Sequence, residues 1–337
     1  MTINVRDNSY PFLPLDYPTQ KRKSPVKSFC HHWWYFALLI ELFVCCTSRK
    51  SKKVTRPHHQ NGYSLILPVT VTYLLLNWGL SFVLLYGMIY NKTLNRTTLK
   101  IIAAISMTVD HIGAFLIYPI YVEACMVNGV EMMGGGNSGQ SQISIRIFRI
   151  LGRLAFPLFA FMIVEGFQHT HNLKRYLWRL LLFAAISEIP YDLANTNCIL
   201  DFGKQNVLWT FIIAIIMLCT LEKYALKRKN KIVRVGLTFT TVLIATICAI
   251  LSDGGIGGIF LIASMYLFRK EKKSYWLATI LSLFIMTLEF KWIQLFAIFA
   301  LVLLKKYNGQ KEKSHPYFFY IFYPAHLIIL WFVSLII

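Results

Sequence analysis

The sequence LKIIAAISMTVDHIGAFLIYP, from Leu99 to Pro119, decides the fold class. An apolar run of about 20 residues is long enough to cross the hydrocarbon core of a bilayer as a helix. This run holds an adjacent acid and histidine near its middle, Asp110 and His111. It therefore predicts a membrane-spanning helix that carries polar groups inside the membrane.

Further apolar stretches of similar character occur on both sides of this run, so we expect an all-α fold, a polytopic transmembrane bundle of about 9–10 spans. The shortest stretches, between residues 256 and 304, fit either closely packed helices or partly re-entrant segments. A weaker stretch at Trp33–Cys46 fits an interfacial helix. The other predicted spans are Leu65–Tyr90, Ile145–Phe167, Tyr176–Ile189, Val207–Leu221, Val235–Leu251, Ile256–Phe268, Trp276–Leu288, Trp292–Leu304 and Tyr317–Ile337.

The composition excludes a soluble or disordered chain. Of 337 residues, 56% are hydrophobic and 15% are charged, whereas soluble domains carry roughly 25% charged residues. The net charge of +20 would suggest a nucleic-acid partner in a soluble protein. In this apolar background it indicates a lipid bilayer instead, and we expect no nucleic-acid partner. The seven cysteines show no metal-ligand spacing, so we expect no metal.

The basic residues fix the predicted orientation. From residue 91 onward, 20 basic residues fall in alternate loops and three in the loops between them. The positive-inside rule places the basic loops in the cytoplasm. Nine spans from Leu99 onward then leave the C-terminus outside. We therefore expect a multi-pass protein of the bacterial cytoplasmic membrane with an external C-terminus.

The N-terminal part of the chain does not fit this alternation. Its basic stretch, which includes Arg49 and Arg56, favours the cytoplasm, but a crossing at Leu65–Tyr90 would then invert the rest. We divide the chain into an accessory region, residues 1–90 with one span, and a polytopic membrane domain, residues 91–337. Residues 1–87 are either a segment of atypical topology or an upstream translation that the working protein lacks, because Met88 precedes the first well-behaved span.

Ionisable groups inside the predicted spans are the candidate site residues. A charge near the bilayer centre costs about 2.5–3.5 kcal/mol on insertion scales, so it usually faces the bundle interior. Asp110 and His111 lie about ten residues, or roughly 15 Å, from the start of their span. A membrane-buried imidazole beside a carboxylate is a plausible general base. The alternative is a structural pair bonded to neighbouring helices.

A second group follows in RIFRILGRLAFPLFAFMIVEG. Arg149 and Arg153 share a helical face, and Pro157 interrupts the hydrogen bonding of this helix. Arg153 is able to pair with Asp110 or to bind a carboxylate or phosphate. Glu165, at the inner end of the span, is a candidate substrate-binding residue or a member of a structural ion pair.

A third group closes the next predicted span. Pro190 is expected to end a helix, and Glu188 and Asp192 then place two carboxylates at its C-terminal end. Anions at that end oppose the helix dipole. They therefore call for a cation, either a protein arginine or a substrate amine, unless they are ordinary exposed acids.

Taken in order, several segments resemble the TraX family, whose named member is a conjugal-transfer protein linked to acetylation of the pilin N-terminus. The resemblance runs from about Thr97 to Ile337, which is more than 70% of the chain. The segments are LKIIAAISMTVDHIG, RILGRLAFPLFAFMIVEGFQHT, YLWRLLLFAAISEIPYDLA, QNVLWT, SDGGIGGIF and YNGQKEKSHPYFFYIFYPAHL. His171 departs from the basic residue expected after the His-Thr pair.

The resemblance implies an integral-membrane acyltransferase that transfers acetyl from acetyl-CoA to a pilin-like N-terminus or another envelope component. It supplies no catalytic residues, so the roles come from membrane chemistry. His111 is the expected base, and Arg149 and Arg153 stabilise charge. Asp110 either orients His111, directly or through a neighbouring helix, or pairs with Arg153. The carboxylates of the third group would receive an acceptor amine. The alternatives are a transporter that uses the same polar residues for a small solute and a non-catalytic envelope-assembly protein.

Overall fold

A computed structural model describes residues 93–119, 122, 138–290, 292–310 and 317–336. Over these residues the chain is helical, and no strand forms. The predicted span Leu65–Tyr90, the interfacial stretch and the rest of the accessory region lie outside the described residues. The helical elements are α3 (Arg96–Ile112), η1 (Gly113–Ile117), α5 (Ser138–Gly152), α6 (Ala155–His169), α7 (Leu173–Thr196), α8 (Val207–Thr220), η2 (Leu221–Ala225), α9 (Lys231–Cys248), α10 (Gly255–Leu267), α11 (Lys272–Phe290), η3 (Trp292–Phe299), α12 (Ala300–Lys305) and α13 (Phe318–Ser334).

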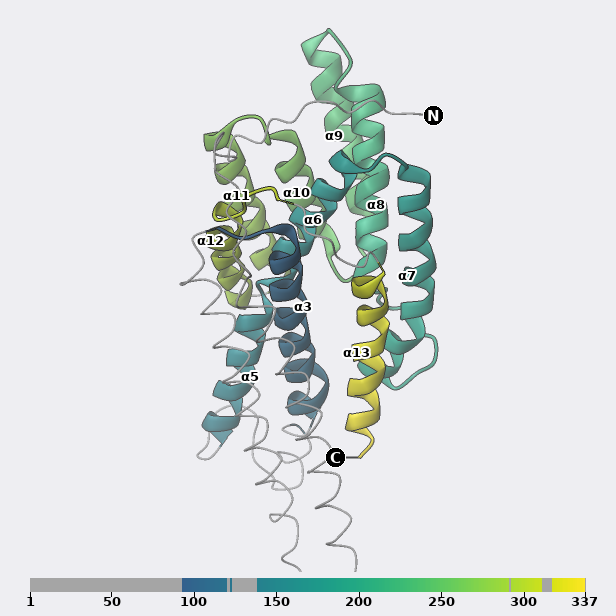
Figure 1. Cartoon of the computed structure of the whole chain (residues 1–337), viewed down its shortest axis with the longest axis vertical. Helices are drawn as coiled ribbons and strands as arrows, with labels where there is room; N and C mark the ends of the chain where they lie inside the picture. Colours follow the sequence, from purple (N-terminus) through teal and green to yellow (C-terminus); the bar gives the residue numbers. More distant parts are fainter. Residues whose placement is uncertain (1–92, 120–121, 123–137, 291, 311–316, 337) are drawn as a thin grey trace, which may run out of the picture. The chain divides into compact units, whose positions relative to one another are not determined.

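The helices run up and down in a bundle, which confirms the predicted all-α class (Figure 1). Within the described residues, four segments are long and apolar enough to cross a membrane, namely Arg96–Ile117, Ile145–His169, Val207–Ala225 and Lys231–Cys248. Their outward faces are apolar. On α9, for example, the exposed fractions of Phe239 and Ile247 are 68% and 58%. A bundle with such faces is built for lipid rather than water.

Asparagine side chains cap the N-termini of four of the described helices. The side-chain oxygens of Asn95, Asn172, Asn206 and Asn230 accept hydrogen bonds from backbone N–H groups in the first turns of α3, α7, α8 and α9. Asparagine is among the best N-cap residues because its oxygen satisfies an otherwise unpaired N–H group. Figure 1 shows the first turns of α3, α7 and α9 at the same end of the bundle. This is the end that carries the predicted cytoplasmic loops.

The short apolar stretch after Gly255 forms a closely packed helix, which is the first of the two alternatives the sequence allowed. A Cβ atom added to Gly257 of α10 would lie 2.2 Å from Cγ of Met286 on α11. Only a residue without a side chain fits at that crossing. Small residues permit close helix approach in membranes, where packing contacts replace the hydrophobic effect between helices.

The expectation that Pro190 ends a helix is wrong. Helix α7 continues through Pro190 to Thr196 and ends at Asn197, which adopts a left-handed φ of 56°. Packing explains why the helix survives the proline: the next two residues, Tyr191 and Asp192, are both buried. Neighbouring helices commonly compensate for proline inside membrane helices.

Candidate functional site

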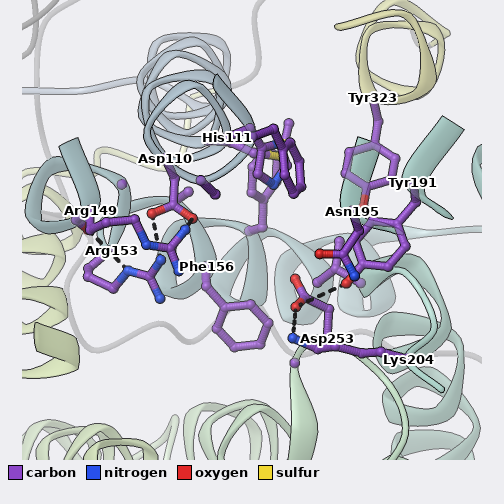
Figure 2. Close-up of a pocket in the computed structure, with 18 of the residues that line it drawn as sticks. Asp110, His111, Arg149, Arg153, Phe156, Tyr191, Asn195, Lys204, Asp253 and Tyr323 are labelled. Carbon is purple, nitrogen blue, oxygen red and sulfur yellow. Dashed lines mark hydrogen bonds and ion pairs between the residues drawn. The ribbon is translucent and has the colours of Figure 1, made fainter. Parts of the chain in front are cut away.

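A polar cavity of about 200 Å³ opens among α3, α5, α6, α7, α8, α11, η3 and α13. It is lined by groups that are costly to bury in an apolar bundle, and Figure 2 shows how they lie. The charged or titratable residues among them are Asp110, His111, Arg149, Arg153, Lys204 and Asp253, together with the phenols Tyr191 and Tyr323. Sites for drug-sized ligands have volumes of roughly 300–1,000 Å³, so this cavity is smaller than such a site. It suits the reacting end of a ligand rather than a whole coenzyme.

One wall is an arginine cluster, which we define as Asp110, Arg149 and Arg153. Each carboxylate oxygen of Asp110 accepts from a different guanidinium, at 2.8 Å from Arg149 and 2.5 Å from Arg153. Arg153 also donates to Oε1 of Gln294 at 3.1 Å. One anion shared by two cations leaves a net charge of +1. The predicted pairing of Arg153 with Asp110 therefore forms, and the cluster retains positive charge beside the cavity.

Two small features of the chain place this cluster. Helix α5 stops at Gly152 and α6 begins at Ala155, so the interruption falls at Arg153. Arg153 is four residues before Pro157, whose missing N–H group cannot bond to the Arg153 carbonyl. A Cβ atom on Gly152 would lie 2.3 Å from both Cβ and Oδ1 of Asp110. The glycine therefore lets α3 and α5 approach closely enough for both ion pairs.

His111 meets a second histidine that the sequence reasoning did not include in the site. Nδ1 of His111 lies 2.8 Å from Nε2 of His326 on α13. On its other side, Nδ1 of His326 lies 2.9 Å from the carbonyl oxygen of Phe322. The two rings are nearly parallel, with an interplanar angle of 6°. Both carboxylate oxygens of Asp110 are bonded to arginines. His326, and not Asp110, is therefore the residue that contacts Nδ1 of His111.

When both imidazoles are neutral, this chain of contacts permits one pair of tautomers. A carbonyl oxygen only accepts, so the proton of His326 sits on Nδ1 and its Nε2 is the acceptor. His111 must then donate from Nδ1. The proton-free nitrogen of His111 is consequently Nε2, on a ring that lines the cavity.

The opposite wall is formed by an Asp253 group, which we define as Asp253, Lys204 and Tyr191. The Lys204 ammonium lies 2.6 Å from Oδ1 of Asp253, and the Tyr191 hydroxyl donates to the same oxygen at 3.5 Å. Burial raises the pKa of Asp253, but the Lys204 ammonium, acting together with His111 and Arg153, holds the pKa below its ordinary value. Figure 2 shows this group and the arginine cluster on opposite sides, with His111 between them.

Three of the predicted substrate-binding residues lie outside the cavity lining. Glu165 is buried near the other end of the bundle, where it pairs with Arg96 and accepts from the Tyr307 hydroxyl at 3.2 Å. Glu188 accepts from the side chains of Asn206 and Trp209, at 2.5 and 2.7 Å. Asp192 accepts from the backbone N–H group of Asp201 at 2.9 Å. In the structure these carboxylates hold protein groups together.

The site residues that the sequence reasoning missed did leave signals. His326 is a lone imidazole in the apolar segment FFYIFYPAHLIIL. Lys204 is one of the three cations on the cation-poor side of the predicted topology. Asp253 precedes a glycine-rich turn that indicated only a tight connection. Among the described residues, no group of three or more His, Cys, Asp or Glu side chains is arranged to hold a metal ion.

The fold and the cavity define a multi-pass helical membrane protein with a polar, histidine-containing site inside the bundle. The TraX protein family matches residues 95–334, so the chain belongs to that family. It is also 26% identical over 258 residues to the Probable fimbrial assembly protein FimC, serogroup H1, of Dichelobacter nodosus. That match covers 69% of this chain and 92% of the relative. No solved structure matches the chain.

Proposed function

We propose that this protein is a membrane acyltransferase that moves acetyl from acetyl-CoA to an amine or hydroxyl of a pilin-like or other envelope component. The observation that carries the proposal is the contact of His111 with His326, from which we infer that Nε2 of neutral His111 carries no proton. A fixed tautomer beside positive charge is what acyl transfer needs, since the reaction removes a proton and develops an oxyanion.

The proposed reaction uses the two nitrogens of His111 for different tasks. Nε2 takes a proton from the acceptor, the freed nucleophile attacks the thioester carbonyl carbon, and the carbon–sulfur bond breaks. The imidazolium then returns its proton to the CoA sulfur, so the products are the acetylated acceptor and the CoA thiol. During the step Nδ1 continues to donate to His326, which keeps the ring in place.

The arginine cluster is proposed to stabilise the oxyanion. Arg149 and Arg153 have five N–H donors each, and a shared Asp110 leaves several of these for a ligand. The Arg153 side chain is only 13% exposed, and positive charge acts more strongly in such surroundings than at a surface. The cavity admits only the acetyl end of acetyl-CoA, so the rest of the coenzyme would stay outside it.

The comparisons support an envelope role. The Dichelobacter relative carries fimbrial assembly in its name, and we extend that setting, a pilus-like structure of a bacterial envelope, to this chain. The basic ends of the helices are proposed to face the cytoplasm and the C-terminus the outside. The cavity, which contains residues from the cation-poor loops, would then be reached by the acceptor from the external side.

The test is a reconstituted assay with the full chain in lipid nanodiscs, labelled acetyl-CoA and a small acceptor. We expect acceptor-dependent release of CoA, and we expect His111→Asn to lower the rate about 10²–10⁴-fold, the usual contribution of general acid–base catalysis. His171→Asn is the matched control, because His171 is exposed and outside the cavity. Solute flux into liposomes without acyl transfer would instead support a transporter.

A further inference from the structure

The Asp253 group holds a primary ammonium inside the cavity in the structure itself. The Lys204 side chain reaches Asp253 from the loop between α7 and α8, and its ammonium lies 2.6 Å from the carboxylate. Both side chains keep contact with the outside: the exposed fractions are 44% for Lys204 and 34% for Asp253. An exposed ion pair contributes only about 0–1 kcal/mol to stability. The contact is therefore easily exchanged for a similar one.

The two partners differ in rigidity. The backbone N–H group of Asp253 donates to the Gln205 carbonyl at 2.9 Å, and the N–H group of Gly254 donates to the Thr210 hydroxyl at 3.0 Å. A Cβ atom on Gly254 would lie 2.6 Å from Cγ2 of Thr210, so the turn is tightly packed. Lys204, in contrast, is a flexible four-carbon chain. The backbone that carries the Asp253 carboxylate is held in place, whereas the Lys204 ammonium stands at the end of a chain with several rotatable bonds.

Charged groups of opposite sign lie on the two sides of His111. The arginine cluster on one side carries a net positive charge, whereas the negative charge of Asp253 on the other side is balanced by Lys204 in the structure (Figure 2). A cationic ligand is repelled by the first wall, and it gains an ion pair at the second wall only where it replaces the Lys204 ammonium. Its nitrogen would be held across the cavity from the place where a carbonyl oxygen is stabilised.

We propose that Asp253 and Tyr191 form a recognition site for the primary ammonium group of the acceptor, and that Lys204 occupies this site until the acceptor displaces it. This inference rests on the proposed function and deepens it, because it assigns residues of this chain to the recognition of an amine acceptor. Lys204 acts as a tethered competitor that keeps the carboxylate paired in the empty enzyme. The external carboxylates Glu188 and Asp192 are not needed for this task, since protein donors already occupy them.

The chemistry balances with one base. An α-ammonium group has a pKa of about 8 and is mostly protonated at neutral pH. It passes one proton to Nε2 of His111, and the neutral amine attacks the thioester carbonyl. The carbon–sulfur bond breaks, the sulfur takes the first proton from His111, and the amide nitrogen loses its second proton to solvent. The products are the acetamide, the CoA thiol and one proton.

The first experiment measures binding without catalysis. Lys204 in the full chain is labelled with an amine-reactive reagent and quantified by mass spectrometry, with L-alaninamide or lactamide present at equal concentration. The two probes differ only in that alaninamide carries an amine where lactamide carries a hydroxyl. Because alaninamide itself consumes the reagent, labelling is expressed as the ratio of Lys204 to exposed Lys227. We expect alaninamide to raise this ratio severalfold and lactamide to leave it unchanged. An equal ratio with both probes would overturn the proposal.

The second experiment measures transfer. Asp253→Asn should raise the KM for alaninamide about 10- to 100-fold, as expected for a lost bond to a charged group, and Lys204→Met should lower it. Asp201→Asn in the same loop is the control and should change neither. Labelling that responds to alaninamide without CoA release would uphold the ammonium site and refute acyl transfer. CoA release with an unchanged KM in Asp253→Asn would refute the ammonium site and leave acyl transfer standing. If Asp253→Asn does not fold, an unchanged KM in Lys204→Met would refute the ammonium site instead.

Discussion

Replacing Gly152 by alanine tests whether the close approach of α3 and α5 builds the arginine cluster. The new Cβ atom would lie 2.3 Å from Oδ1 and Cβ of Asp110 and 2.6 Å from its Cγ. Asp110 must therefore move away. Its two carboxylate oxygens are the ones that accept from Arg149 and Arg153, so both ion pairs loosen together.

The magnitude follows from two costs and one gain. Overpacking a tight contact costs about 1–3 kcal/mol, and fully breaking a buried ion pair costs about 3–5 kcal/mol. Alanine recovers up to about 1 kcal/mol of helix propensity relative to glycine. Because the ion pairs loosen rather than disappear, we expect a net loss of about 3 kcal/mol, or roughly 6–12 °C in Tm for a domain of this size.

The assay is thermal unfolding of matched variants in the same detergent or nanodisc. Gly236→Ala on α9 is the control, because a Cβ atom there has nothing within 4 Å. That variant should keep or slightly raise the Tm. We also expect Gly152→Ala to reduce acyl transfer beyond its loss of folded protein. A Gly152→Ala variant that unfolds like the wild type would refute the idea that this glycine is required by Asp110.

The remaining predictions concern the second histidine, the topology and the N-terminal region. His326→Leu should lower kcat about 10²-fold and change the acid limb of its pH profile, because Nδ1 of His111 loses its acceptor; His326→Gln should recover part of the rate. A merely structural His326 would lower the amount of folded protein and leave the pH profile unchanged. A cysteine introduced near Lys229 should resist an impermeant thiol reagent in intact cells, whereas one at the C-terminus should react; the reverse pattern would invert the topology. A chain that starts at Met88 should insert and function, and failure to insert would show that the first 87 residues are integral.

The sequence predicted the helical class well because membrane spans obey a simple rule of length and apolarity. It also placed Asp110, His111, Arg149 and Arg153 among the candidate residues, because ionisable groups are conspicuous in apolar surroundings. The structure confirms that all four line one cavity. Their chemical roles stay predictions.

The rest depended on contacts between distant parts of the chain. His111 and His326 are separated by 215 positions, and no local pattern specifies that α13 returns beside α3. Glu188 and Asp192 misled the reasoning for the same reason, since helix-end carboxylates without visible partners suggest a ligand. Their partners, Asn206, Trp209 and the Asp201 backbone, come from the loop and helix that follow. The path of α7 through Pro190 likewise reflects packing on later helices.

The long separation between His111 and His326 has a consequence for biosynthesis. The last described helix, α13, packs against α3 and α7, so it must return to the first ones after all the intervening helices have been made. Until then His111 has no partner that fixes its tautomer, and the nascent chain holds an unfinished site. A chain terminated before α13 would keep the arginine cluster and the Asp253 group but lack the histidine pair. Synthesis of α13 thus sets the moment at which this protein acquires its proposed base.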